Sequence, residues 1–229
     1  MALDRGPITD SLARRARGWS PLKAGILWQR RLRNRLIDRW LGIDTTGVIH
    51  GPRPGTQFGD QLHYECLDYR LQRKYLAALR IGPQDVVIDV GCGLGRVLCA
   101  CARMGAHECI GIEYDATLAA KARENARTLR GRRSPIAVRV GDAVEADYSR
   151  GTVIWMFNPF GEQTMKRVLA RIEQSLAAAP RTLRICYVNP VHEALLAACG
   201  WLHYKGTRRS PFFSRVPAKF WSNSVQWTL

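Results

Sequence analysis

The chain has 229 residues, of which 46% are hydrophobic, so it can bury one full-sized core with an extension beside it. Its formal net charge of +16 indicates an anionic partner or surface. The apolar runs are far shorter than the ~20 residues that cross a bilayer, and the N-terminus lacks the apolar stretch of a signal peptide. We therefore expect a cytoplasmic protein, peripheral at most to a membrane surface.

The N-terminal residues 1–61 are predicted to form a basic helical extension and a loop, ahead of a domain at 62–229. Residues 22–41 have the period of an amphipathic helix rich in arginine. Its apolar stripe consists of Trp28, Leu32, Leu36 and Trp40, with Ile37 and Leu41 alongside. We expect this stripe to pack on the catalytic core; the alternative is that it docks on an anionic membrane surface or on nucleic acid.

The segment 42–61 combines glycine, proline and polar residues and predicts a loop, and 62–80 predicts a second helix that ends before Gly82. Short β-rich runs then alternate with helical patterns, which indicates βαβ units and a parallel sheet. The predicted strands are 85–90, 108–113, 135–140, 152–157 and 182–188, and the predicted helices are 94–104, 116–130, 162–178 and 190–199. Two further β-like runs cover 201–205 and 220–227.

A glycine-rich turn follows the first of these strands. The sequence Asp89-Val90-Gly91-Cys92-Gly93-Leu94-Gly95 spaces its glycines as G-x-G-x-G and leads into a helix. Such a turn lets the backbone approach a ligand, while the helix N-terminus supplies amide donors. A dinucleotide fingerprint would need glycine at position 96, where this chain has Arg96, so the turn does not favour NAD.

Acidic residues end the next two strands. Glu113 follows Gly95 by eighteen residues, where a carboxylate can accept hydrogen bonds from both hydroxyls of a ribose. Asp142, in Gly141-Asp142-Ala143, could bind the amino group of adenine. The alternative is that both acids cap the helices that follow them.

These motifs resemble the class I S-adenosylmethionine-dependent methyltransferase family over roughly residues 82–200. The resemblance implies an α/β fold with a Rossmann-like, seven-stranded, mostly parallel sheet whose last strand is antiparallel, and S-adenosyl-L-methionine as cofactor. Asp89 and the glycine turn would hold the methionine part, Glu113 the ribose and Asp142 the adenine edge. The implied cofactor-binding residues are Asp89, Gly91, Cys92, Gly93, Gly95, Glu113, Tyr114, Asp142, Ala143 and Asn158.

The fourth strand leads into Asn158-Pro159-Phe160-Gly161, which resembles the NPPY-type signature of amine and amide N-methyltransferases but departs from it at the third and fourth positions. An asparagine carbonyl can orient an N–H nucleophile for in-line methyl transfer, with Phe160 as a wall of the pocket. The predicted acceptor is therefore a nitrogen of a small-molecule amine, a lipid headgroup or a protein side chain. His63 and Tyr64 are our candidates for a catalytic base.

Two alternatives to this function stay open. An RNA methyltransferase could grip phosphates with its basic ends and stack bases on the aromatic residues of its tail, although the same residues could be a hairpin core. They are Phe212, Phe213, Phe220 and Trp221. The other alternative is a non-catalytic cofactor-binding module.

The seven cysteines are odd in number and include no CxxC pair. This pattern excludes a regular disulfide framework or zinc site. We expect reduced thiols that fill the core, and no metal.

Overall fold

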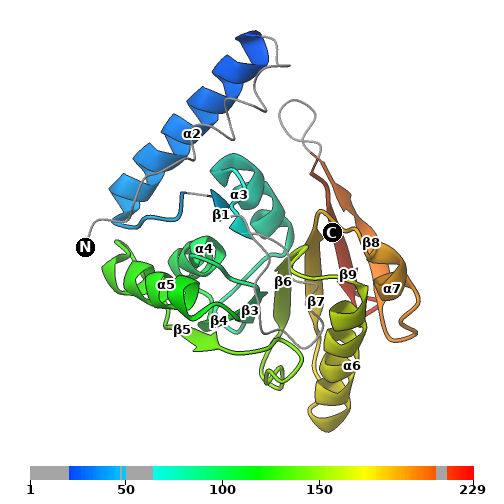
Figure 1. Ribbon diagram of the computed structural model, residues 1–229. Helices are drawn as coiled ribbons and strands as arrows, with labels where there is room; N and C mark the ends of the chain where they lie inside the picture. The colour runs from blue at the N-terminus through cyan, green and yellow to red at the C-terminus, as the bar shows by residue number, and fades with distance from the viewer. Residues whose placement is uncertain (1–20, 47, 50–63, 210–215) are drawn as a thin grey trace.

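The computed structural model describes residues 21–46, 48–49, 64–209 and 216–229, and a seven-stranded sheet runs through its middle (Figure 1). The strands lie in the order β5-β4-β3-β6-β7-β9-β8. The first five strands in this order, β5, β4, β3, β6 and β7, are parallel, whereas β9 is antiparallel to its neighbours β7 and β8. The expected sheet, with its antiparallel last strand, is therefore confirmed. The strands are β3 (Val86–Val90), β4 (Glu108–Glu113), β5 (Ile136–Val140), β6 (Val153–Phe157), β7 (Arg184–Val188), β8 (His203–Arg208) and β9 (Ala218–Ser222).

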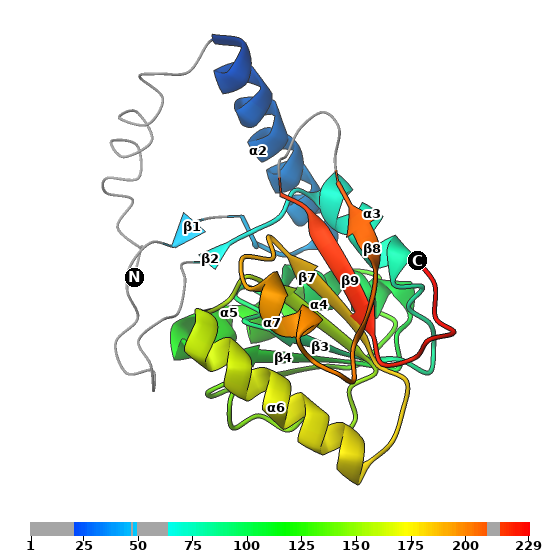
Figure 2. The ribbon, with the colours of Figure 1, turned by 90° about the vertical axis from the view of Figure 1, so that its right-hand side faces the viewer.

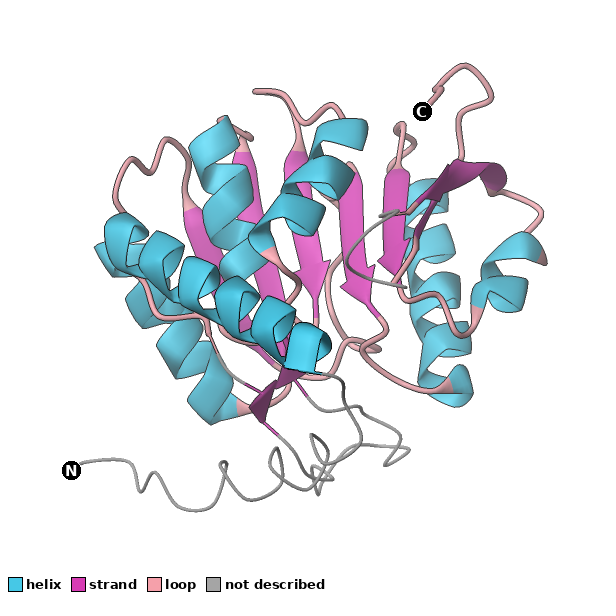
Figure 3. Ribbon diagram, turned by 90° about the horizontal axis from the view of Figure 1, so that it is seen from above, coloured by secondary structure: helices cyan, strands magenta, loops and turns pink. Residues whose placement is uncertain are grey.

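Helices cover both faces of the sheet (Figure 3). One face packs against α3 (Tyr69–Ala78), α4 (Arg96–Met104) and α5 (Ala116–Thr128), and the other against α6 (Glu162–Ala178) and α7 (Glu193–Ala197). Alternate residues of β3 enter the two cores, so Val87 lies with α4 and Ile88 with α6. Because both faces of the central strands are covered, they are continuous apolar runs, which made them predictable.

The region before the sheet differs from the prediction of a helix over 62–80. Tyr64–Glu65 forms a short strand, β2, that pairs antiparallel with β1 (Val48–Ile49) inside the predicted loop. The helix α3 begins only at Tyr69, because the Asp68 carboxylate accepts a hydrogen bond from the Arg70 amide and so caps the first turn.

The basic helix is confirmed as α2 (Pro21–Leu41). Ile37 and Leu41 pack on the core as expected, but the expected packing of the other four stripe residues is wrong. Trp28, Leu32, Leu36 and Trp40 are all exposed. The opposite side of the helix faces the domain, with Asn34 and Asp38 buried. The figures show α2 along one edge of the molecule (Figure 2). The guanidinium of Arg103 in α4 lies 5.0 Å over the ring of Trp40, which is nevertheless 65% exposed.

The structure also settles the role of two tail aromatics. Phe220 and Trp221 lie in β9 and are buried in the two cores, so the hairpin-core interpretation holds for them and the alternative of base stacking is wrong. Phe212 and Phe213 lie outside the described residues. All seven cysteines are free thiols, five of them buried. No described helix has the length and apolar character to cross a bilayer, and the described residues contain no cluster of metal-ligating side chains.

Candidate functional site

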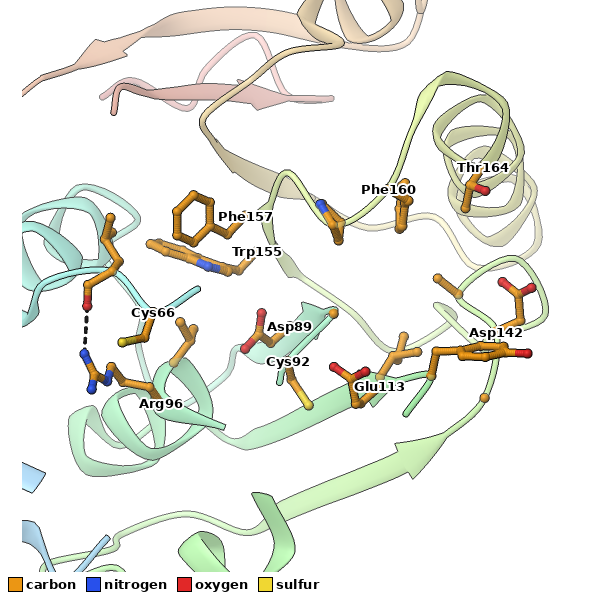
Figure 4. Close-up of a pocket in the computed structure, with 18 of the residues that line it drawn as sticks. Cys66, Asp89, Cys92, Arg96, Glu113, Asp142, Trp155, Phe157, Phe160 and Thr164 are labelled. Carbon is orange, nitrogen blue, oxygen red and sulfur yellow. Dashed lines mark hydrogen bonds between the residues drawn. The ribbon is translucent and has the colours of Figure 1, made fainter. Parts of the chain in front are cut away.

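A pocket opens where β3, β4 and β6 end, at the point where the strand order reverses (Figure 4). Together with the solvent-filled space at its mouth, it encloses about 910 Å³. The residues that line it are Cys66, Leu67, Gln72, Asp89, Gly91, Cys92, Arg96, Val97, Ile112, Glu113, Tyr114, Gly141, Asp142, Ala143, Trp155, Phe157, Pro159, Phe160 and Thr164.

The glycine turn forms the floor of this pocket at one side. Gly91 adopts a φ of 75°, and a Cβ atom there would lie 2.8 Å from the Cβ of Pro159. Glycine is thus needed for the backbone conformation and for the close approach of the fourth motif. Gly93 and Gly95 were also predicted to hold the cofactor, but they do not line the pocket. Gly95 instead packs against Ala122. A Cβ atom added at position 95 would lie 3.2 Å from the Cβ of Ala122.

Glu113 joins the second strand end to the glycine turn. One carboxylate oxygen accepts a hydrogen bond of 2.8 Å from the Gly93 amide, and the other accepts one of 3.0 Å from the Asp115 amide. These bonds use one acceptor site on each oxygen. Glu113 therefore stabilises the turn in this structure and still lines the pocket.

Asp89 is the most strongly perturbed carboxyl group of the pocket. It is only 4% exposed and lies beside Trp155 in the sheet register. Burial, with a further contribution from the negative charge of Glu113, raises the pKa of Asp89 to about 8. A cationic ligand placed against Asp89 would reverse this shift, because it would favour the ionised carboxylate.

The third strand end places Asp142 and Ala143 in the wall of the pocket, as the sequence predicted, next to Tyr114. One oxygen of Asp142 accepts a hydrogen bond of 2.9 Å from the Val144 amide. This local bond fixes the carboxylate at the rim in the manner of an Asx turn. Both an adenine contact and the alternative of a local cap are compatible with that geometry.

Aromatic side chains gather at the end of β6. Trp155, Phe157 and Phe160 line the pocket, and Figure 4 shows them along one wall. Asn158, between them in sequence, does not line it. Its φ is 39°, a conformation rare for residues other than glycine, and its side-chain oxygen accepts a hydrogen bond of 3.0 Å from the Tyr187 hydroxyl. The structure thus holds Asn158 rigidly beside the pocket.

The two candidate bases gain no support. His63 lies outside the described residues, and Tyr64 lies in β2, where only its backbone is described.

Arg96 is the main site residue that the sequence did not predict. It begins α4, lines the pocket and is only 3% exposed. Its guanidinium donates to the Thr45 hydroxyl at 2.6 Å and to the Leu67 carbonyl at 2.9 Å, and it lies 3.4 Å from the Asp38 carboxylate. It also stacks 4.3 Å above the ring of Tyr69. Arg96 therefore connects the pocket with α2 and its following loop.

Gln72 of α3 is a second residue that the sequence did not predict. Its side chain is almost fully buried and lines the pocket, with its amide nitrogen 3.4 Å from the Arg96 carbonyl. Its side-chain oxygen has no hydrogen-bond partner among the described residues. A buried acceptor without a partner is costly, so this oxygen is available to an N–H or O–H group of a ligand. Cys66 and Leu67 complete this side of the pocket.

Comparisons with known proteins agree with this geometry. Residues 89–191 match the family model described as the ANTKMT methyltransferase domain. The chain is similar to an RNA methyltransferase from Salinibacter ruber solved with S-adenosyl-L-homocysteine, with a TM-score of 0.54 and 20% identity over 71% of this chain and 96% of that one. It is also similar to magnesium protoporphyrin IX methyltransferase from Synechocystis, solved with bound S-adenosylmethionine, with a TM-score of 0.51 and 14% identity over 67% and 80% of the chains.

Among curated proteins, a 23S rRNA (uracil(1939)-C(5))-methyltransferase from Acidithiobacillus ferrooxidans is 36% identical over 87 residues. The matched region is 29% of this chain and only 20% of that relative. The solved neighbours share the fold, yet their names give an RNA and a porphyrin as acceptors. The fold therefore does not specify the acceptor.

Proposed function

This chain is a member of the class I, Rossmann-like family of S-adenosylmethionine-dependent methyltransferases, and on that premise we propose that it transfers the methyl group to a nitrogen atom. The acceptor is a small-molecule amine, a lipid headgroup or a protein side chain. One observation carries the cofactor part of the proposal: Asp89, Glu113 and Asp142 line one pocket from three successive strand ends, opposite an aromatic wall.

For the cofactor, we assign the ammonium of the methionine part to Asp89, the ribose to Glu113 and the adenine edge to Asp142. The buried, partnerless oxygen of Gln72 supports an additional contact to an N–H donor of the ligand, because it lies on the same side of the pocket as Arg96 and the start of α4. The positive end of the α4 dipole favours the negative carboxylate of the cofactor.

For the acceptor, we assign orientation of the nucleophile to Phe160, which lines the pocket, and to Asn158, which lies two residues earlier and outside the lining. The lone pair of a neutral amine attacks the methyl carbon, the carbon–sulfur bond breaks, and S-adenosyl-L-homocysteine leaves with the bonding electrons. Such a displacement gains mainly from in-line positioning. The rigid placement of Asn158 by its positive φ and by Tyr187 supports this role, and the aromatic wall of Trp155 and Phe157 suits a cationic sulfonium.

The cofactor assignment is tested by calorimetric titration with S-adenosyl-L-methionine and with NADH. We expect micromolar-range binding of S-adenosyl-L-methionine, lost or strongly weakened in Glu113→Gln. Because Glu113 also holds the turn, melting of the ligand-free variant must show that it is folded. Binding of NADH without S-adenosyl-L-methionine would overturn the assignment.

The acceptor assignment is tested with cofactor labelled in its methyl group and lysate fractionated into small molecules, lipids, RNA and protein. We expect label on nitrogen, which survives mild base, whereas label in methyl esters does not. Asn158→Gly keeps the positive φ and removes the amide, so it should lower kcat. Asn189→Gly, at φ 50° after the neighbouring strand and outside the pocket, is the matched control. Label confined to RNA carbon atoms would contradict the proposal.

A further inference from the structure

The outer face of α2 exposes four large apolar side chains. Trp28, Leu32, Leu36 and Trp40 are 65%, 42%, 58% and 65% exposed, and their spacing by four places them in one stripe along the helix. Single exposed apolar residues are ordinary on protein surfaces, whereas a contiguous stripe of two tryptophans and two leucines marks an interaction surface. We call these four residues the outer stripe.

The inner face of α2 fixes the direction in which the outer stripe points. The Asp38 carboxylate accepts hydrogen bonds from Thr45, Thr46 and Tyr69. Asp68 of the core also receives the Arg33 guanidinium at 2.5 Å. These buried polar bonds would be lost if the helix turned its apolar side inward, so the exposure of the outer stripe is part of the folded structure.

Arginines border the outer stripe on the same side of the helix. Arg31, Arg35 and Arg39 are all exposed, and each lies one position before a stripe residue. The chain as a whole carries a net charge of +16. A cationic edge beside a tryptophan- and leucine-bearing face has the composition of a helix that lies in a membrane interface.

We propose that α2 docks on an anionic phospholipid bilayer, parallel to its surface. The outer stripe enters the boundary between headgroups and acyl chains, with Trp28 and Trp40 at its two ends, and the three arginines contact lipid phosphates. Leu32 and Leu36 argue against RNA as the occupant, because leucine offers neither charge for a phosphate nor a ring for a base. The proposal does not depend on the methyl acceptor.

Docking in this way would hold the pocket at a fixed distance from the bilayer. Arg96 lines the pocket and contacts Asp38 on the inner face of α2. The docking face and the pocket are thus joined by one buried ion pair. An acceptor that resides in or on the membrane would be presented to the pocket without a long search in solution.

The test is flotation of the full chain with vesicles of phosphatidylcholine and phosphatidylglycerol, compared with pure phosphatidylcholine. We expect binding to the anionic vesicles only. Leu32→Ser combined with Leu36→Ser should reduce partitioning at least ~10-fold, because two apolar side chains no longer enter the bilayer. Val191→Ser combined with Val225→Ser removes two exposed apolar side chains elsewhere and should bind as the parent protein does.

A second variant separates charge from apolar burial. Replacing Arg31, Arg35 and Arg39 with glutamine should weaken anionic-vesicle binding by about fivefold per charge. All these positions are exposed, so melting curves should match the parent protein. Equal flotation of the leucine variant and the parent protein would overturn the proposal. The proposal would also be overturned if the parent protein failed to bind vesicles but bound RNA, or self-associated in sedimentation velocity, and if the leucine variant lost that interaction.

Discussion

Replacement of the buried Asp89 by asparagine should stabilise the ligand-free protein. Burial and the Glu113 charge raise the pKa of Asp89 to about 8 from its ordinary 3.8. Between pH 3.8 and about 8 the folded protein keeps Asp89 protonated, whereas the unfolded chain releases that proton. The free energy of unfolding therefore falls as the pH rises through this range, and Asp89 causes no further change above about pH 8. At neutral pH this costs up to about 4 kcal/mol, at ~1.4 kcal/mol per pH unit. The Asp89→Asn change removes that cost, because an amide does not ionise.

The assay is thermal and urea unfolding of Asp89→Asn and its parent between about pH 5.5 and 8. The gain in the free energy of unfolding should grow with pH. Asp147→Asn is the control: hydrogen bonds from Ser149, with help from Arg139, hold the pKa of this exposed carboxyl below its usual value, so its loss should not stabilise the protein. A difference for Asp89→Asn that is independent of pH, or a loss of stability at about pH 8, would refute the reasoning.

Packing and charge give three further predictions. Arg96→Met should destabilise the protein by about 3–5 kcal/mol in urea unfolding, because it leaves Asp38 buried without its ion pair, and adding Asp38→Asn should restore part of the loss. Gly91→Ala should abolish cofactor binding in calorimetry, whereas Gly105→Ala, at φ 86° with open space around its Cβ, should cost only the strain of the left-handed backbone, about 1–2 kcal/mol of stability. Cys66, half-buried in the pocket wall, should react with iodoacetamide before the buried thiols, and S-adenosyl-L-methionine should protect it in mass spectrometry.

The strands and helices of the sheet could be predicted from local patterns, whereas the seven-stranded sheet with its antiparallel last strand was implied by the family resemblance. Each parallel strand is a short apolar run with a helical pattern after it, and burial on both faces gives that run its composition. The pocket acids were found for the same reason, since the carboxyl ends of parallel strands meet at one edge. Asp89, Glu113 and Asp142 needed only the correct strand ends, not the correct tertiary contacts.

Residues that depend on distant partners could not be predicted in this way. The apolar stripe of α2 shows which side of the helix is apolar, but not which side has a partner. Asp38 and Arg96 are 58 positions apart, and no periodicity relates them. Gln72 appeared only as a polar position within an apolar helix pattern, although a glutamine that the helix period places on the buried side was a signal that could have been noticed.

Position 96 joins the two main results. A dinucleotide-binding turn has glycine there so that its helix can pack closely against the strand. In this chain the same position holds an arginine, and the side chain reaches away from the glycine turn to Asp38, Thr45 and Leu67. Arg96, which stands where an NAD-binding turn has glycine, is therefore also the residue that links α2 to the pocket through its contact with Asp38. If Arg96 were shortened to alanine, α2 would lose its buried cation, and we expect cofactor affinity and vesicle binding to fall together, although neither ligand touches the other's surface.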